Sequence, residues 1–146
     1  MTTGYTTGVF DLFHVGHLRI LERARENCDH LVVGVTTDEL ALQRKGRRPV
    51  IPFDERMAIV SAVRCVDQVV PQSSMDKMLA WRTYGFNKVF VGDDWRGTPA
   101  WAALELQFAQ VGVEIVYFPY TAHTSSTLIR RILERFDAGT SVSLSQ

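Results

Sequence analysis

The stretch GVFDLFHVGHLRILERA, residues 8–24, joins an apolar run to an amphipathic one. In its second half, Leu18, Ile20, Leu21 and Ala24 recur at helical spacing, with charged side chains on the opposite side. The first half continues an apolar run that begins at Tyr5 and is typical of a buried strand. A buried strand that passes directly into a helix is the first half of a βα unit, so this stretch predicts an α/β fold.

The same alternation of strand and helix occurs five times along the chain. The expected strands are residues 5–10, 30–36, 66–70, 88–93 and 113–118. The expected helices are residues 15–27, 52–65, 73–85, 97–112 and 125–136. This order predicts α/β architecture: a single Rossmann-like, doubly wound domain with a five-stranded parallel sheet over residues 1–137. Residues 138–146 are small and polar and are expected to form a flexible tail.

Composition narrows the possible functions. The 146 residues are 46% hydrophobic and carry a net charge of zero, which argues against a broad surface for nucleic acid or anionic membrane. Cys28 and Cys65 are far apart in sequence and outside any CxxC motif, so reduced thiols are expected. There is no run of about 18 apolar residues that could span a bilayer, and no signal peptide is recognisable. We therefore expect a cytoplasmic protein.

The unusual polar clusters fall in the segments that follow the expected strands. In doubly wound sheets, ligands bind beyond the carboxyl ends of the strands, where the strand order reverses. That rule predicts five functional loops, which are Phe10–His17, Thr37–Arg48, Gln72–Lys77, Asp93–Thr98 and Tyr120–Ser126.

His14 and His17 flank Gly16 where the first strand should give way to a helix. Helix N-termini bind anions through their N–H groups and dipole, and glycine allows a phosphate to approach the backbone. Two imidazoles three residues apart on a first turn point the same way and could both donate to a phosphoryl oxygen. A metal pair and two chance surface histidines are the alternatives, although no third histidine or thiolate is spaced to complete a metal site.

Residues 8–17, GVFDLFHVGH, resemble the G-x-F-D-x-x-H-x-G-H signature of the HxGH nucleotidyltransferases, specifically the cytidylyltransferase family. Five further motifs occur in the order and spacing of the glycerol-3-phosphate cytidylyltransferase branch, namely VVGVTTDEL, PF-x-ER-x-x-I-V, VRCVDQVVP, FVGDDW and SST-L-I. The resemblance extends to about residue 136. It implies transfer of CMP from CTP, with Mg²⁺, to a small phosphorylated alcohol such as glycerol 3-phosphate or a related phosphate or phosphonate. Pyrophosphate would be released, and the chain would be a homodimer.

The resemblance also implies roles for individual residues. His14 and His17 would contact the triphosphate and stabilise the transition state, and Lys45 would reach the phosphates with them. Lys77 and His123 would bind the acceptor. The positions implied for the nucleotide are Gly8, Val9, Phe10, Asp11, Gly16, Arg47, Arg64, Asp93, Asp94, Tyr120, Thr121, Ser125 and Ser126.

Several of these residues have an alternative role. Asp11 could instead orient its loop through local hydrogen bonds. Arg64 could be an ordinary partner of a helix C-terminus. Arg44 and Arg48 are expected to be solvated, and the three tryptophans are expected to be packing residues.

One loop departs from the glycerol-3-phosphate pattern. Tyr120 stands where that branch has an arginine, and His123 stands where it has a glycine. A phenol cannot replace the bidentate donor that an arginine offers a phosphate, so glycerol 3-phosphate itself is expected to be a poor or moderate acceptor. The rival functions are an adenylyltransferase that uses ATP and a non-catalytic nucleotide-binding module. A dinucleotide-dependent oxidoreductase ranks low, because the first turn lacks G-x-G-x-x-G.

Overall fold

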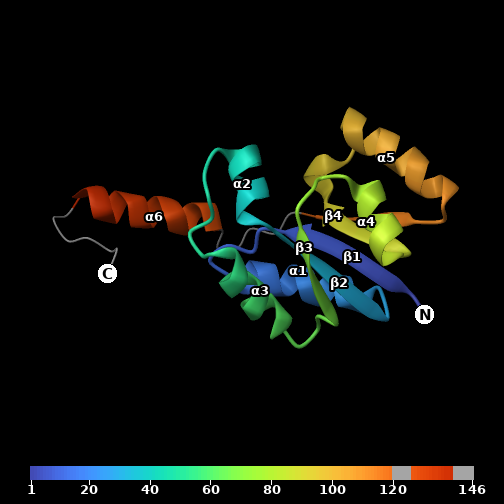
Figure 1. The fold of residues 1–146 in the computed structure, drawn as a ribbon, viewed down its shortest axis with the longest axis horizontal. Coiled ribbons are helices and arrows are strands. Elements are labelled where there is room, and N and C mark those ends of the chain that lie inside the picture. The colour runs from blue at the N-terminus through green and yellow to red at the C-terminus, as the bar shows by residue number, and fades with distance from the viewer. Residues whose placement is uncertain (120–125, 140–146) are drawn as a thin grey trace.

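A computed structural model gives the fold, and it describes the backbone of residues 1–119 and 126–139 (Figure 1). Its five-stranded sheet has the order β3-β2-β1-β4-β5, and every paired strand runs parallel. The strands are β1 (Thr3–Gly8), β2 (His30–Thr36), β3 (Gln68–Gln72), β4 (Lys88–Gly92) and β5 (Glu114–Phe118). The predicted Rossmann-like α/β fold is therefore confirmed, and the strand order reverses between β1 and β4.

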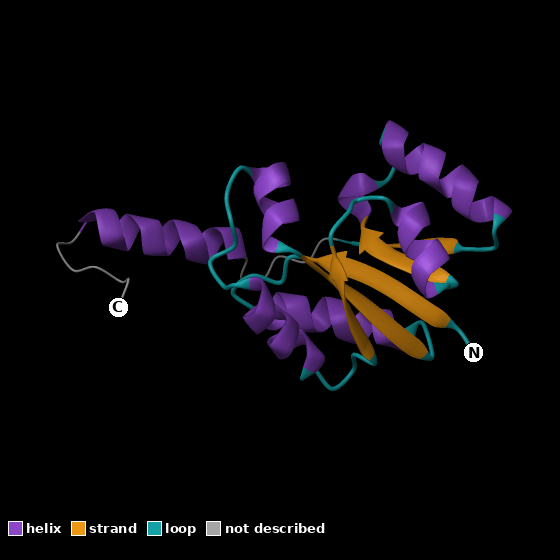
Figure 2. Ribbon diagram, viewed as in Figure 1, coloured by secondary structure: helices purple, strands orange, loops and turns teal. Residues whose placement is uncertain are grey.

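Within the described residues, six α-helices and one short 3₁₀ helix connect and flank these strands (Figure 2). They are α1 (Val15–Glu26), α2 (Asp38–Lys45), α3 (Phe53–Ser61), α4 (Lys77–Tyr84), η1 (Asp93–Trp95), α5 (Pro99–Gln110) and α6 (Ser126–Gly139). Helices α1 and α3 cover one face of the sheet, whereas α4 and α5 cover the other. Helix α6 extends away from the sheet, beyond its carboxyl edge.

The two faces of the sheet carry separate hydrophobic cores because side chains alternate along each strand. In β2, Leu31, Val33 and Val35 point into the core that α1 and α3 cover. Val32, between them, points into the core that α4 and α5 cover, where it joins Tyr5. Burial on both faces accounts for the nearly continuous apolar run in β2.

The largest difference from the sequence prediction is α2, which occupies most of the predicted loop Thr37–Arg48. Thr37 caps the helix by accepting a hydrogen bond from the N–H of Leu40 at 3.2 Å. Gly46 ends it in the left-handed conformation, at φ 74°. Both signals are present in the sequence, but eight residues with little hydrophobic periodicity did not stand out as a helix.

The ends of several helices and strands also differ from the predicted ends by a few residues. Strand β1 ends at Gly8, two residues before the prediction, so Val9 and Phe10 belong to the loop that follows. Helix α4 begins at Lys77, four residues later than predicted, because Asp76 caps it by accepting from the N–H of Leu79. Both shifts lengthen the segments at the carboxyl edge.

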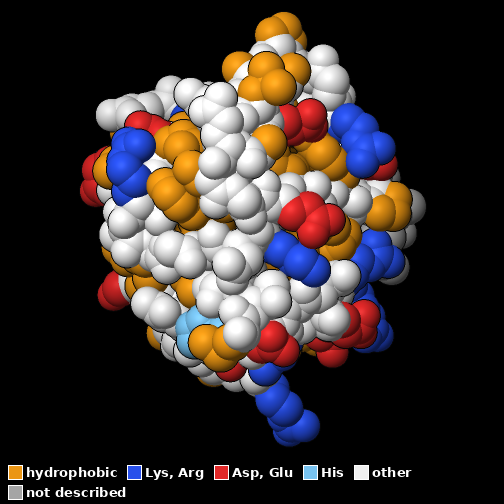
Figure 3. Space-filling view, turned by 90° about the vertical axis from the view of Figure 1, so that its right-hand side faces the viewer, with side chains coloured by type: hydrophobic (Ala, Val, Ile, Leu, Met, Phe, Trp, Pro, Cys, Tyr) orange, Lys and Arg blue, Asp and Glu red, His pale blue; other side chains and the backbone are white. Residues whose placement is uncertain are grey.

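The surface opposite α6 mixes positive, negative and apolar side chains without a field of one sign (Figure 3). Cys28 and Cys65 are both free thiols, as expected. Over the part of the chain that the structure describes, every helix is too short or too polar to cross a membrane.

Candidate active site

A cleft of about 1020 Å³ opens at the carboxyl edge of the sheet, where β1 and β4 diverge. Its volume lies at the upper end of the range for small-molecule sites, which is about 300–1,000 Å³. The cleft brings together most of the predicted site residues, namely Gly8, Val9, Phe10, Asp11, His14, Gly16, His17, Lys45, Lys77, Asp93 and Asp94. The cleft lies where the strand order reverses, the position at which the rule for doubly wound sheets predicts a ligand site.

His14 and His17 form a reciprocal cap at the start of α1. The Nδ1 atom of His14 accepts a hydrogen bond from the N–H of Gly16 at 3.0 Å, and the Nδ1 atom of His17 accepts from the N–H of His14 at 3.2 Å. The two rings stack with their centroids 4.0 Å apart. Since each Nδ1 is an acceptor, the proton of each neutral ring lies on Nε2. Both rings can therefore present an Nε2–H donor to a ligand in the cleft.

His17 is neutral at physiological pH. Burial, followed by the neighbouring His14, lowers the pKa of His17 to about 4. Phe10 and Phe13 contribute to that burial, with ring centroids 5.5 Å and 5.2 Å from the His17 ring. His17 therefore offers a ligand an oriented N–H dipole and not a full positive charge.

The loop that leads from β1 to the histidines is strained, and Asp11 holds it in place. Phe10 and Leu12, on either side of Asp11, adopt φ angles of 54° and 51°, a region that costs residues other than glycine free energy. The buried Asp11 carboxylate accepts from the N–H groups of Val50 at 2.8 Å and Ile51 at 2.9 Å.

Arg130 of α6 also donates to Asp11, at 2.9 Å, so three donors from two distant segments converge on one carboxylate. Burial raises the pKa of Asp11, but the N–H groups of Ile51 and Val50 and the charge of Arg130 outweigh it and hold the pKa below its usual value. These contacts support the alternative that Asp11 orients its loop; contact with a nucleotide stays a prediction.

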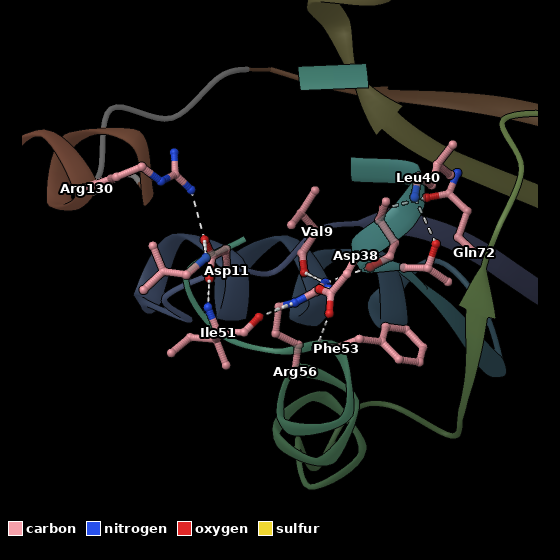
Figure 4. Close-up of polar contacts among 12 residues, drawn as sticks. Val9, Asp11, Asp38, Leu40, Ile51, Phe53, Arg56, Gln72 and Arg130 are labelled. Carbon is pink, nitrogen blue, oxygen red and sulfur yellow. Dashed lines mark hydrogen bonds and ion pairs between the residues drawn. The ribbon is translucent and has the colours of Figure 1, made fainter. Parts of the chain in front are cut away.

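Arg56, in α3, is fully buried and joins four segments around the site (Figure 4). Its Nη1 atom donates to the carbonyl oxygens of Val9 and Thr36, both at 2.7 Å. Its Nε atom donates to the carbonyl oxygen of Ile51 at 2.8 Å, and its Nη2 atom forms a 2.7 Å ion pair with Asp38. Sequence reasoning placed Arg56 within a family motif but assigned it no role. Its partners lie up to 47 residues away, and no local pattern reveals them.

Basic side chains from α2 and α6 line the cleft beside the histidines. Arg44 and Lys45 come from the last turn of α2, and Arg130 comes from α6. Partial burial and then repulsion from Arg130 lower the pKa of Lys45. The expectation that Arg44 is merely solvated was incomplete, because this exposed residue also lines the cleft. Arg47 lies in a small adjoining recess that Lys45 and Arg130 also line.

Lys77 is a buried cation with few polar contacts. Only 8% of the residue is exposed, and its Nζ donates to Oγ1 of Thr7 at 2.9 Å. It also lies 5.9 Å from the centroid of the Tyr5 ring. Burial, and then repulsion from Arg44, lower the pKa of Lys77 to about 8, which leaves it mostly protonated at pH 7. Within residues 1–119 and 127–136, no carboxylate forms an ion pair with this ammonium.

The far side of the cleft follows β4. Asp93 and Asp94 are exposed at its rim, in η1. Trp95 is 41% exposed and lies 6.3 Å from Trp101, measured between ring centroids, and both line the cleft. Trp81 packs against the second core, as expected, and Trp95 and Trp101 pack against each other at the wall of the cleft.

The structure does not bring every predicted residue to the cleft. Arg64 is exposed and close in sequence to Asp67, whose N–H donates to the carbonyl oxygen of Leu31 at the amino edge of the sheet, opposite the cleft. Ser126 is the first residue of α6. The remaining predicted positions lie outside the described residues: Tyr120, Thr121, His123 and Ser125.

Comparison with known proteins agrees with this geometry. Residues 5–132 match the family described as cytidylyltransferase-like. The chain is 34% identical to glycerol-3-phosphate cytidylyltransferase of Bacillus subtilis over 126 residues, which cover 86% of this chain and 92% of that protein. It is 32% identical to FAD synthase of Thermococcus sibiricus over 136 residues, which cover 90% and 92% of the two chains. Among solved structures, the lipopolysaccharide core biosynthesis protein of Thermoplasma volcanium superimposes with a TM-score of 0.70 at 25% identity, over 85% of this chain and 99% of that one.

Replacing Arg56 with methionine tests whether the guanidinium holds these segments together. We expect Arg56→Met to lower the free energy of unfolding by about 3–5 kcal/mol, because it leaves Asp38 and three carbonyl groups without their donor. The measurement is urea denaturation at pH 7. As a control, Arg19→Met removes the exposed ion pair with Glu22 and should cost less than about 1 kcal/mol. Equal losses in the two variants would contradict the role given to Arg56.

The low pKa of His17 predicts how its ring titrates. Following the ring protons by NMR should give a midpoint near pH 4, with the resonance assigned by its absence in His17→Gln. Between the unfolded value of 6.5 and this midpoint, the folded chain binds fewer protons than the unfolded chain. The contribution of His17 to stability is therefore complete above pH 6.5 and declines as the pH falls. A midpoint at or above 6.5 would show that the ring is not buried as described.

Proposed function

We propose that this chain, which belongs to the cytidylyltransferase-like family, transfers CMP from CTP to a small phosphorylated alcohol and releases pyrophosphate. The observation that carries the proposal is the pair of Nε2–H donors at the start of α1, in a cleft that also receives Arg44, Lys45 and Lys77. This arrangement suits the transfer of a group between phosphate oxygens, which needs positioning and charge stabilisation more than it needs a strong base.

The reaction can be written for the residues present. An oxygen of the acceptor phosphate forms a bond to the α-phosphorus of the nucleotide. The bond from that phosphorus to the oxygen bridging to the β-phosphorus breaks, and its electron pair leaves with pyrophosphate. His14 and His17 donate to the phosphoryl oxygens as negative charge redistributes, and the N-terminus of α1 adds its dipole. Lys45 and Arg44 stabilise the departing pyrophosphate.

Lys77 is the residue we assign to the acceptor phosphate. A buried ammonium without a carboxylate partner is costly, and an anionic ligand relieves that cost. Its hydrogen bond to Thr7 fixes the ammonium at the end of β1, on the other side of the strand-order reversal from Asp93 and Asp94. The acceptor and the base of the nucleotide would then lie on opposite sides of the α-phosphate.

Mg²⁺ is proposed to enter with the nucleotide. It prefers carboxylate and phosphate oxygens, and in nucleotide enzymes it relies on one or two carboxylates together with the substrate. The fitting protein ligands are the rim carboxylates Asp93 and Asp94. The residues that the structure describes hold no group of three or more potential ligands placed as a metal cage. When bound, Mg²⁺ would neutralise part of the triphosphate charge.

ATP is the second candidate donor. The reason is specific, because FAD synthases resemble this chain about as closely as the glycerol-3-phosphate cytidylyltransferases do. An FAD synthase forms a flavin dinucleotide by adenylyl transfer, so the two groups of relatives differ in both donor and acceptor. Both donors therefore belong in one experiment.

Pyrophosphate release should be measured with CTP and with ATP, each against glycerol 3-phosphate, flavin mononucleotide and a panel of other phosphate and phosphonate esters. We expect turnover with CTP and at least one acceptor, and loss of turnover when Mg²⁺ is chelated. His14→Ala and His17→Ala should each lower kcat roughly 10²- to 10³-fold, the effect of one lost transition-state donor.

His30→Ala is the matched control, because His30 begins β2 at the opposite edge of the sheet. It should leave kcat unchanged, and thermal unfolding would confirm that all three variants fold. Turnover with ATP but not with CTP would show that ATP, and not CTP, is the donor. Near wild-type rates in both active-site variants would overturn the site.

We also propose that two copies associate through α6. This helix carries apolar side chains that are 38–56% exposed, namely Leu128, Ile132, Leu133 and Phe136. They recur at helical spacing on a helix that extends away from the sheet, and together they form an apolar stripe. A second copy of the same helix could cover this stripe.

Sedimentation should therefore show a dimer at micromolar concentration. Ile132→Glu should shift it to monomer, because a charge is introduced into the apolar contact. Leu106→Glu is the matched control: Leu106 is 71% exposed on α5, and the same change there should leave the dimer intact. A wild-type monomer, or a dimer insensitive to Ile132→Glu, would count against this interface.

A further inference from the structure

The cleft divides into a polar side and an apolar wall. The polar side, described above, contains the histidines and the basic groups of α2 and α6. The apolar wall is formed by residues just before and within α4 and by one side of α5, namely Met75, Met78, Ala100, Trp101, Ala103 and Leu104. A triphosphate and a metal ion are charged and gain nothing from contact with an apolar wall, so part of the wall must face another portion of the ligands.

Two methionines of this wall lie on either side of Lys77 in sequence. Met75 is 40% exposed, and its sulfur accepts a 3.5 Å hydrogen bond from Nε2 of Gln72, which steadies an otherwise flexible side chain at the end of β3. Met78 is partly buried against the second core and also lines the cleft. Thioethers are polarisable and adapt to flat apolar surfaces, especially aromatic rings.

The position of Lys77 assigns this part of the wall to the acceptor. Attacking and leaving oxygens lie on opposite sides of a phosphorus that is transferred in line. If the acceptor phosphate is bound by Lys77, then whatever is attached to that phosphate lies beside Met75 and Met78. A three-carbon polyol would leave these side chains in contact with water, whereas an apolar or aromatic group would cover them.

We propose that the acceptor of this chain carries a flat apolar group close to its phosphate, and that Met75 and Met78 form the subsite for that group. The inference rests on the proposed function for the place of the acceptor phosphate. The subsite itself follows from Met75 and Met78, which lie on either side of Lys77 in sequence and line the same cleft. It assigns acceptor choice to the segment that leads into α4.

A pair of ligands tests the subsite without requiring turnover. 2-Phenylethyl phosphate and glycerol 3-phosphate share the phosphate and differ in the attached body. Calorimetric titration of the full chain with CTP present, and with Mg²⁺ withheld and added to the same samples only afterwards, should give a dissociation constant at least about tenfold lower for the phenyl ester, the scale of apolar contacts in a specificity pocket. Met75→Gln should reduce that preference severalfold, and Met78→Gln should act in the same direction.

Leu79→Gln is the matched control, because Leu79 is 47% exposed on α4 and is not part of the cleft wall. It should leave both dissociation constants unchanged. Met75 is itself exposed, so its variant keeps the test decisive even if Met78→Gln does not fold. Equal affinity for the two esters, or a preference that survives Met75→Gln, would overturn the subsite.

Pyrophosphate release in the same samples separates the two proposals. Tight, Met75-dependent binding of the phenyl ester without pyrophosphate release from CTP or ATP would sink the transferase assignment and leave the subsite standing. Turnover of glycerol 3-phosphate with no preference for the phenyl ester would support the transferase assignment and overturn the subsite.

Discussion

The carboxyl edge of this domain depends on one buried guanidinium. Arg56 binds the carbonyl group that follows β1, the carbonyl group that ends β2, the first turn of α2 and the segment that leads into α3. Only arginine offers five N–H donors in a rigid planar fork, so no other side chain could serve four segments at once. Water cannot replace these bonds inside the domain. The position of the loop between β1 and α1 relative to α2 is therefore fixed by a residue that the cleft itself does not contain.

The strained loop explains why such support is needed. Positive φ angles at Phe10 and Leu12 each cost on the order of 1–3 kcal/mol. Asp11, between them, offsets this cost through donors from the Val50–Ile51 segment and from α6. In return, the loop turns the chain sharply enough for His14 to cap α1 and for His17 to stack against it. The strained loop thus fixes two imidazoles whose Nδ1 atoms both accept hydrogen bonds from backbone N–H groups.

The features that could be predicted from the sequence are those that leave a pattern among residues close together in the chain. Alternating strand and helix predicted the sheet, and the order of the strands led to the cleft. The histidine pair was recognisable because two residues three positions apart on the first turn of a helix necessarily point the same way. Arg56 and the Asp11–Arg130 pair were not, since all but one of their partners are 18 to 119 residues away and each of these residues looks ordinary in sequence. Helix α2 was missed although its capping residues, Thr37 and Gly46, are close in sequence, because the residues between them show little hydrophobic periodicity.

The cluster of positive charges in the cleft suits an anionic ligand, whereas without a ligand these charges repel one another. The chain as a whole has no net charge, yet Arg44, Lys45 and Lys77 meet in one cleft. The buried carboxylate beside them, Asp11, is already engaged by Arg130 and by two backbone N–H groups. Burial lowers the pKa values of Lys45 and Lys77, and repulsion from neighbouring arginines, chiefly Arg130 for Lys45 and Arg44 for Lys77, lowers them further. An anionic ligand turns that repulsion into attraction, so binding stabilises the folded chain through the same groups that destabilise it alone. The neutral ring of His17 avoids adding to the repulsion, and its burial beside Phe10 and Phe13 is the physical reason that it stays neutral.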